Sequence, residues 1–212
     1  MASDIMRLVY KRGELVKYVS HLDFVKVFER AIRRAGIEVA FSGGFNPRML
    51  LVFGNPLPVG YTSSCELLDI TFAKPYKTNY IAHTLNKYLP GDIAVVSATA
   101  LEKPYASILQ TVSFAGYEGK IEGLEPGFGE RLNQAFNENE TIFTMKRSKS
   151  GEKNVDIKPM IKEFVITGGT LKITALSGQE GSLRPELALE AVSKLAGISD
   201  LSLVSVHKTM ML

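Results

Sequence analysis

The residues best suited to chemistry lie in one short segment, Lys17 to Asp23. His21 can gain or lose a proton near neutral pH, and the carboxylate of Asp23 stands two residues away. Ser20 is suited to cap a helix that begins after it, because its hydroxyl can accept a hydrogen bond from a first-turn N–H. These groups suit either general acid–base catalysis by His21 and Asp23 or the binding of an anion at a helix N-terminus.

Anion binding is the stronger of these two interpretations. The sequence places no second histidine and no nucleophile near His21, since His83 and His207 lie far along the chain. A third interpretation needs no ligand: His21 is then a partly buried residue that makes a local hydrogen bond at the start of a helix.

A cationic helix is expected after Ser20. Asp23 at its third position completes a capping box, and Gly36 is a natural stop. The apolar residues that recur with helical period, and are expected to face the core, are Val25, Phe28, Ile32 and Ala35. The cations expected on the opposite face are Lys26, Arg30, Arg33 and Arg34. Such a face is often only a solvated surface, but it also suits phosphate contact.

The positive charge of the chain is concentrated near its beginning. Residues 7–53 hold nine Lys or Arg against four acids, whereas the whole chain has a formal charge of +3. This local excess exceeds the surplus of the whole chain, so the distribution of charge points to an anionic partner more clearly than the total does.

A glycine-rich loop, Phe41 to Arg48, follows the cationic helix. Cations interleaved with aromatic rings suit phosphate contact and base stacking on single-stranded RNA, although phenylalanines such as Phe41 and Phe45 more often lie in a core. At a third place, Arg184 stands where a helix is expected to begin, and its charge opposes the helix dipole there. The candidates for contact with RNA or another anion are Lys17, Ser20, His21, Lys26, Arg30, Arg33, Arg34, Phe45, Asn46, Arg48 and Arg184.

Several site classes are excluded by motif. The sequence contains neither a phosphate-binding GxxxxGK[ST] loop nor a GxGxxG fingerprint. Cys65 is the single cysteine, so a cysteine-rich zinc or iron–sulfur site cannot form within one chain. We therefore expect no metal and no cofactor. No apolar run is long enough for a membrane span, which favours a cytoplasmic protein, and the sequence predicts no oligomeric state.

The pattern of helices and strands predicts an α+β fold with two ferredoxin-like (split βαβ) modules in tandem. Residues 6–100 read as strand, helix, strand, strand, helix, strand, and hold the basic helix and the glycine-rich loop. Residues 108–212 are expected to form a second α+β domain, whose elements resemble a second copy of the same pattern. Within these domains we expect strands at 15–19 and 110–121, and a polar loop at 148–154.

Several motifs together resemble the radical-SAM-linked protein family, a bacterial domain of unknown function found alone or fused to cobalamin-binding radical SAM proteins. The segments that carry the resemblance are 17–23 (KYVSHLD), 30–36 (RAIRRAG), 41–48 (FSGGFNPR), 56–60 (PLPVG), 155–159 (VDIKP) and 182–186 (SLRPE). The resemblance covers the chain from Met6 onward. It implies a separate radical SAM protein as partner, because this chain lacks the three cysteines of a radical SAM cluster.

Three functions remain open at this point. The first is a non-catalytic RNA- or substrate-binding accessory protein that works with a radical SAM enzyme. The second is a His-dependent endoribonuclease or RNA-modification enzyme, since tandem ferredoxin-like CRISPR repeat-processing endoribonucleases are similar at the level of fold. The third is a protein-interaction module that docks its basic face on an acidic partner surface.

Overall fold

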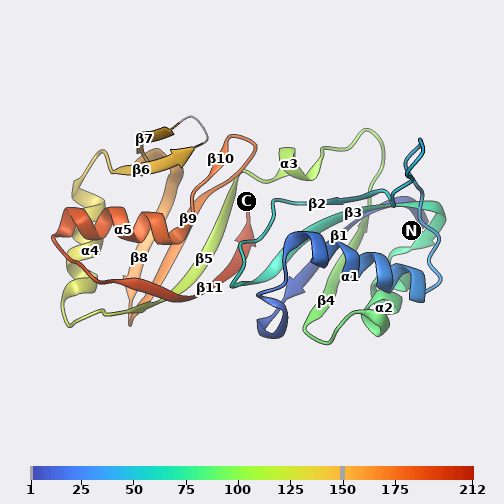
Figure 1. Cartoon of the computed structure of the whole chain (residues 1–212), viewed down its shortest axis with the longest axis horizontal. Helices are drawn as coiled ribbons and strands as arrows, with labels where there is room; N and C mark the ends of the chain where they lie inside the picture. Colours follow the sequence, from blue (N-terminus) through green and yellow to red (C-terminus); the bar gives the residue numbers. More distant parts are fainter. Residues whose placement is uncertain (1, 149–150) are drawn as a thin grey trace. The chain divides into compact units, whose positions relative to one another are not determined.

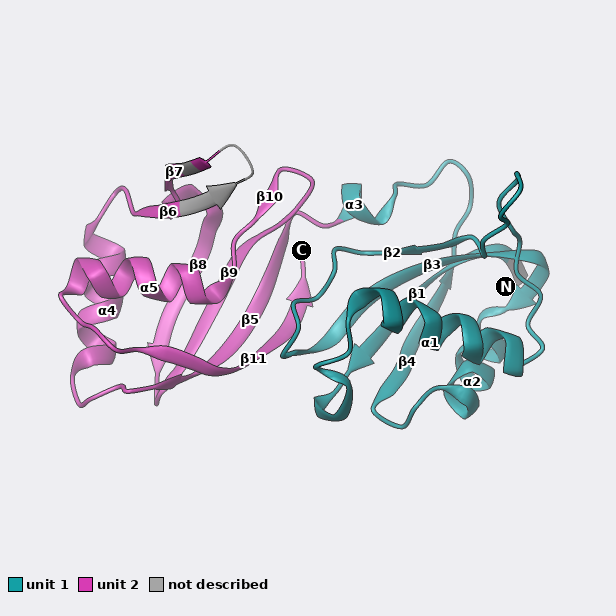
Figure 2. Ribbon diagram, viewed as in Figure 1, with its two compact units in different colours: residues 1–111 teal, residues 112–212 magenta. Residues whose placement is uncertain are grey.

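A computed structural model describes residues 2–148 and 151–212. The chain divides into two compact units, Met1–Thr111 and Val112–Leu212, which Figure 2 shows in different colours. Each unit contains an antiparallel sheet of four main strands with two long helices, and in the second unit the two-residue strand Gly181–Ser182 also pairs with the sheet.

The first unit has the strand order β2-β3-β1-β4, all antiparallel neighbours (Figure 1). Its elements in chain order are β1 (Ala2–Arg12), η1 (Glu14–Val16), α1 (His21–Arg34), β2 (Leu51–Phe53), β3 (Tyr61–Lys77), α2 (Thr78–Tyr88), β4 (Ile93–Ala100) and α3 (Ile108–Thr111). A helix therefore follows the first and the third strand of the unit, which is the ferredoxin-like arrangement.

The second unit repeats this arrangement with the strand order β8-β9-β5-β11. Its elements are β5 (Phe114–Glu122), α4 (Phe128–Glu138), β6 (Phe143–Ser148), β7 (Gly151–Asp156), η2 (Lys158–Met160), β8 (Ile161–Thr167), β9 (Thr170–Gly178), β10 (Gly181–Ser182), α5 (Pro185–Ala196) and β11 (Ser202–Met211). The β6–β7 hairpin is an insertion, and residues 149–150 of the polar loop expected at 148–154 lie outside the described residues. The prediction of an α+β chain with two ferredoxin-like modules is confirmed.

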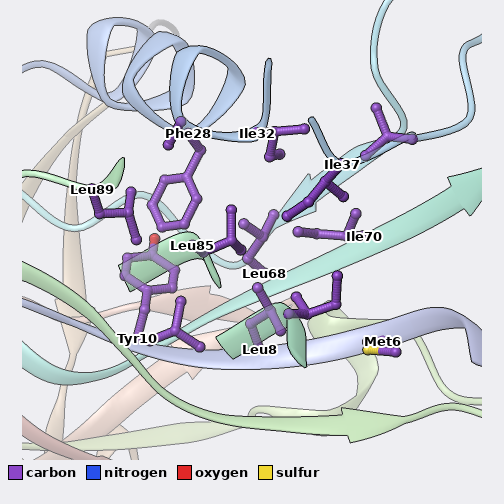
Figure 3. Packing of buried hydrophobic residues seen from close by; sticks show 14 of the residues in the cluster. Met6, Leu8, Tyr10, Phe28, Ile32, Ile37, Leu68, Ile70, Leu85 and Leu89 are labelled. Carbon is purple, nitrogen blue, oxygen red and sulfur yellow. The ribbon is translucent and has the colours of Figure 1, made fainter. Parts of the chain in front are cut away.

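The core of the first unit lies between its sheet and its two long helices. Figure 3 shows Phe28 and Ile32 of α1 pointing toward Leu68 of β3, and both helical side chains are fully buried. Burial of side chains of this size supplies the main driving force for placing α1 on the sheet.

The predicted apolar face of α1 was only partly right. The buried residues of α1 are Phe24, Phe28, Ala31 and Ile32. Val25 and Ala35, which we expected in the core, are half-buried. Phe24 takes the core position instead, because its ring stacks on Tyr10 of β1 with the centroids 5.7 Å apart.

One predicted strand was wrong, and another begins later than expected. Residues 14–16 form the short η1 helix instead of a strand, and 17–20 continue as an irregular segment, because the side chain of Arg12 binds three carbonyls there. Further along, residues 108–111 form α3, and β5 begins only at Phe114. A capping box explains α3, since the amide oxygen of Gln110 accepts a hydrogen bond from the backbone N–H of Ser107 at 3.1 Å.

Candidate nucleic-acid interface

Ser20 caps α1 as the sequence predicts. Its hydroxyl oxygen accepts a hydrogen bond from the Asp23 N–H at 3.3 Å, and the hydroxyl donates to Asp23 Oδ2 at 2.8 Å. Asp23 Oδ1 is 3.1 Å from the ammonium group of Lys26. The hydrogen bond from Ser20, and then Lys26, lower the pKa of the Asp23 carboxyl. Asp23 therefore acts as a helix-cap partner of Ser20.

His21 is the first residue of α1 and is half-buried. The edge of one ring meets the face of the other between His21 and Phe53 of β2, with the centroids 5.7 Å apart. Within residues 2–148 and 151–212, the imidazole makes no hydrogen bond or ion pair with a side chain, and the Asp23 carboxylate is engaged by Ser20 and Lys26. The structure thus places His21 in an aromatic contact and brings it no carboxylate.

Arg12 is a structural residue of this region that sequence reasoning missed. Its side chain is buried, with a relative exposure of 4%. The guanidinium donates hydrogen bonds to the carbonyls of Val16, Lys17 and Val19, and it lies 4.8 Å above the ring of Phe24. Burial lowers its pKa. A basic residue beside a turn gave no sign of this role, because most arginines are exposed.

The cationic face of α1 is largely balanced by neighbouring acids. Two cations of α1 form ion pairs one turn away, Lys26 with Asp23 at 3.1 Å and Arg33 with Glu29 at 3.8 Å. Lys17, which precedes the helix, pairs with Glu14 at 2.6 Å. Glu14 also raises the pKa of Lys17 by accepting its hydrogen bond. Arg34 donates to the carbonyl of Tyr88 at the end of α2, at 2.6 Å. Arg30 alone in this set has no such partner among the described residues.

The glycine-rich loop forms a hairpin-like projection, residues 40–50, which we name the arm. Leu50 N–H donates to the Ala40 carbonyl at 2.9 Å, and Ser42 N–H donates to the Arg48 carbonyl at 2.8 Å. An isolated bridge pairs Phe41 with Met49. The arm is fixed to the sheet where Ala40 N–H donates to the carbonyl of Thr71 in β3. These bonds hold the base of the arm and leave its tip, 43–47, projecting.

The tip of the arm presents its predicted contact residues to solvent. Phe45 has a relative exposure of 106%, and Phe41 at the base has 51%. Asn46 and Arg48 are also exposed, and Arg48 has no acidic partner among the described residues. Residues 40–50 contain no Asp or Glu. The core interpretation of Phe45 is therefore wrong, and the arm carries its positive charge without a neighbouring acid.

The structure separates the predicted site residues into three places. Ser20, His21 and Asp23 lie at the start of α1, whereas the arm follows its end, and a helix of 14 residues is about 20 Å long (Figure 1). Arg184 belongs to the second unit, where it is exposed and directly precedes α5. Only Arg33 and Arg34, in the last turn of α1, share the end of the helix from which the chain enters the arm.

The motif at 155–159 has a structural role in the second unit. Asp156 Oδ1 accepts hydrogen bonds from the N–H groups of Ile142 and Lys158 at 2.9 and 3.0 Å. The Lys158 ammonium donates to the carbonyl of Phe136 near the end of α4 and lies 3.6 Å from the centroid of that ring. These two charged residues therefore hold the chain between α4 and β8.

The described residues form neither a metal cluster nor a membrane-spanning helix. No group of three or more His, Cys, Asp or Glu in these residues is arranged to hold a metal ion. The described helices are all too short or too polar to cross a membrane.

Comparison with known sequences identifies the family. The model of a family described as "Uncharacterized protein conserved in bacteria (DUF2344)" matches residues 6–185. The chain belongs to this family. The match spans most of both units, including the whole of α1 and the arm of this DUF2344 member. No curated protein matches the sequence.

Among solved structures, the chain is similar to one in the "Crystal Structure of a Cbf5-Nop10-Gar1 Complex", with a TM-score of 0.51 and 9% identity. The match covers 98% of this chain and 48% of the other, so the DUF2344 chain spans about half of that protein's length. At this identity the likeness concerns the fold alone, and it agrees with the α+β class.

Proposed function

We propose that this protein is a cytoplasmic, non-catalytic accessory protein that binds RNA through its first unit and works with a separate radical SAM enzyme. The observation that carries the RNA-binding part is the acid-free arm, which presents the side chains of Phe45 and Arg48 to solvent, the latter with no acidic partner among the described residues. A positive charge beside an exposed aromatic ring is the combination that single-stranded nucleic acids favour.

The charges of α1 extend this surface toward the arm. Among the described residues Arg30 forms no ion pair or side-chain hydrogen bond and acts on the Asp23 carboxylate only through its charge, and Arg33 faces Glu29 only at 3.8 Å, so both guanidinium groups are available to a phosphate. Arginine suits this contact because its planar group can donate two parallel hydrogen bonds to one phosphate. Lys17 and Lys26 are held more closely by acids and contribute less to the proposed surface.

The radical SAM partner rests on the resemblance of the motifs in residues 17–23 and 41–48, and on the single cysteine. A chain that presents RNA and lacks a cluster motif needs the redox chemistry to come from another protein. A non-catalytic role is also supported by His21, whose ring contacts Phe53 and which has no carboxylate partner among the described residues. An acid–base role would require a group that orients or tunes the imidazole.

A salt titration of binding to a mixed pool of structured RNA tests the proposal. The native chain is compared with the triple variant Arg30/Arg33/Arg34→Ala and with Arg48→Ala. Each lost phosphate contact reduces the slope of log affinity against log salt by about 0.7 to 0.9, so the triple variant is expected to flatten the slope by about 2. Circular dichroism checks that each variant is folded.

A charge-matched variant, Lys103/Lys120/Lys194→Ala, serves as the control, because all three lysines are exposed and lie outside α1 and the arm. It is expected to keep the native slope. If the native chain fails to bind RNA at low salt, the RNA-binding proposal is wrong. If both triple variants lose affinity equally, the binding is unspecific attraction and the surface is wrongly placed.

A further inference from the structure

The tip of the arm offers an exposed aromatic ring and hydrogen-bond donors, which together suit a ligand that has a planar ring and a negative charge. Both faces of the Phe45 ring are open to solvent, at a relative exposure of 106%. A Cβ added at Gly43 or Gly44 would meet no atom within 4 Å outside the adjacent residues, so the backbone that precedes Phe45 is open to solvent. A planar ligand can therefore approach Phe45 without displacing any part of the arm.

Hydrogen-bond donors lie in the same short loop as this open ring. The N–H groups of Gly43, Gly44, Phe45 and Asn46 find no acceptor within residues 2–148 and 151–212. The Arg48 side chain adds a charged donor, and the Asn46 amide offers both a donor and an acceptor. No Asp or Glu in residues 40–50 opposes an anion. The donors suit phosphate oxygens, whereas the amide suits the edge of a base.

We infer that the arm takes an unpaired nucleotide of RNA, with its base stacked on Phe45 and its phosphate bound by Arg48 and the backbone N–H groups at 43–46. This inference rests on the proposed function and narrows its ligand to single-stranded segments. In a duplex both faces of an internal base are covered by its neighbours, so a projecting phenylalanine can stack only on a splayed or terminal base. Stacking on a ring tolerates all four bases, so the site is selective for strandedness.

The test measures fluorescence anisotropy of a short labelled single-stranded RNA and of the blunt duplex formed with its complement. The native chain is expected to bind the single strand more tightly than the duplex. Phe45→Ala is expected to weaken single-strand binding by about 5- to 100-fold, because one stacked base contributes that much. Phe45→Trp is expected to keep the affinity, since it retains an aromatic face.

Phe143→Ala is the matched control, because Phe143 is an exposed phenylalanine of the second unit. It is expected to leave the affinity unchanged. The salt slope is expected to stay the same in Phe45→Ala and to fall in Arg48→Ala, since stacking releases no counterions.

Three results would overturn the inference. Equal affinity of the native chain for single strand and duplex would show that no unpaired base is needed. If Phe45→Ala binds the single-stranded RNA as tightly as the native chain does, Phe45 is not a stacking site, although the proposed RNA-binding function still holds. Full affinity for RNA in Phe45→Leu would show that an apolar side chain of similar bulk suffices and that no base stacks on an aromatic ring. A native chain that binds neither RNA would contradict the proposed function itself.

Discussion

The side-chain amide of Asn86 in α2 takes the place of a neighbouring strand for Val95 in β4. Its Nδ2 donates to the Val95 carbonyl at 2.9 Å, and the Val95 N–H donates to its Oδ1 at 2.7 Å. β4 is an edge of the sheet in the first unit. Asn133 makes the same pair of bonds to Ile166 in β8, an edge of the sheet in the second unit, at 2.9 and 2.8 Å. In both β4 and β8, one residue therefore has its outward backbone N–H and carbonyl hydrogen-bonded to an asparagine side chain.

The first prediction is that Asn86→Ala destabilises the protein and promotes self-association. The change removes two hydrogen bonds and leaves the backbone groups of buried Val95 without them, at a cost of about 1 to 3 kcal/mol in the free energy of unfolding. Urea denaturation measures the cost, and sedimentation velocity measures association. A freed edge is a template for pairing with another chain.

Asn79→Ala is the control for this prediction, because Asn79 lies on the same helix, is exposed and makes no hydrogen bond through its side chain among the described residues. It is expected to change the unfolding free energy by less than about 0.5 kcal/mol. Equal effects of the two substitutions would show that the bonds to Val95 contribute nothing.

The second prediction concerns Arg12, which holds the segment that leads into α1. Arg12→Lys is expected to lower the free energy of unfolding by about 2 to 3 kcal/mol, because an ammonium group cannot reach the carbonyls of Val16, Lys17 and Val19 with the geometry of a guanidinium. The shift in the urea midpoint at constant slope measures this loss. Lys11→Ala, at the exposed neighbouring position, is expected to be nearly neutral. A neutral Arg12→Lys would mean that the buried charge suffices without its hydrogen bonds.

The third prediction concerns the pKa of Asp23, read by NMR titration of its side-chain carboxyl. Ser20→Ala and Lys26→Ala are each expected to raise this pKa toward the ordinary value near 3.9, because the hydrogen bond from Ser20 and the ammonium group of Lys26 both lower it. A lowered pKa in the folded state stabilises the protein above the unfolded value, and this stabilisation is lost as the pH falls through the folded value. An unchanged pKa in Ser20→Ala would show that the hydroxyl of Ser20 does not hold the Asp23 carboxylate in solution.

Local patterns predicted much of the fold. The capping serine, helical spacing and Gly36 indicated α1, and the alternation of strands and helices indicated two ferredoxin-like modules. The predictions that failed concern segments whose conformation depends on side chains outside the segment itself. The strand expected at 15–19 did not form because Arg12 binds carbonyls of the segment, and no periodicity reports such a bond.

In the candidate site, too, some features follow from local sequence patterns and others do not. The ion pair between Lys26 and Asp23 follows from their spacing of three residues on a helix, so it could have been weighed from the sequence. The complete exposure of Phe45 could not, because hydrophobicity alone favours burial of a phenylalanine. The distance along α1 between His21 and the arm also follows from helix geometry once the bounds of α1 are known.

The last prediction separates His21 from the proposed RNA surface. Because His21 begins α1 and the arm follows its end, His21→Ala is expected to change RNA affinity by less than about twofold, whereas Arg48→Ala weakens it and flattens the salt slope by about 0.7. His21→Ala is expected to cost about 0.5 to 1.5 kcal/mol of stability, since it removes the contact with the ring of Phe53. His21→Phe restores an aromatic contact and serves as the control for stability. If His21→Ala instead abolished turnover of an RNA while leaving its binding intact, the protein would be an enzyme and the accessory role would be wrong.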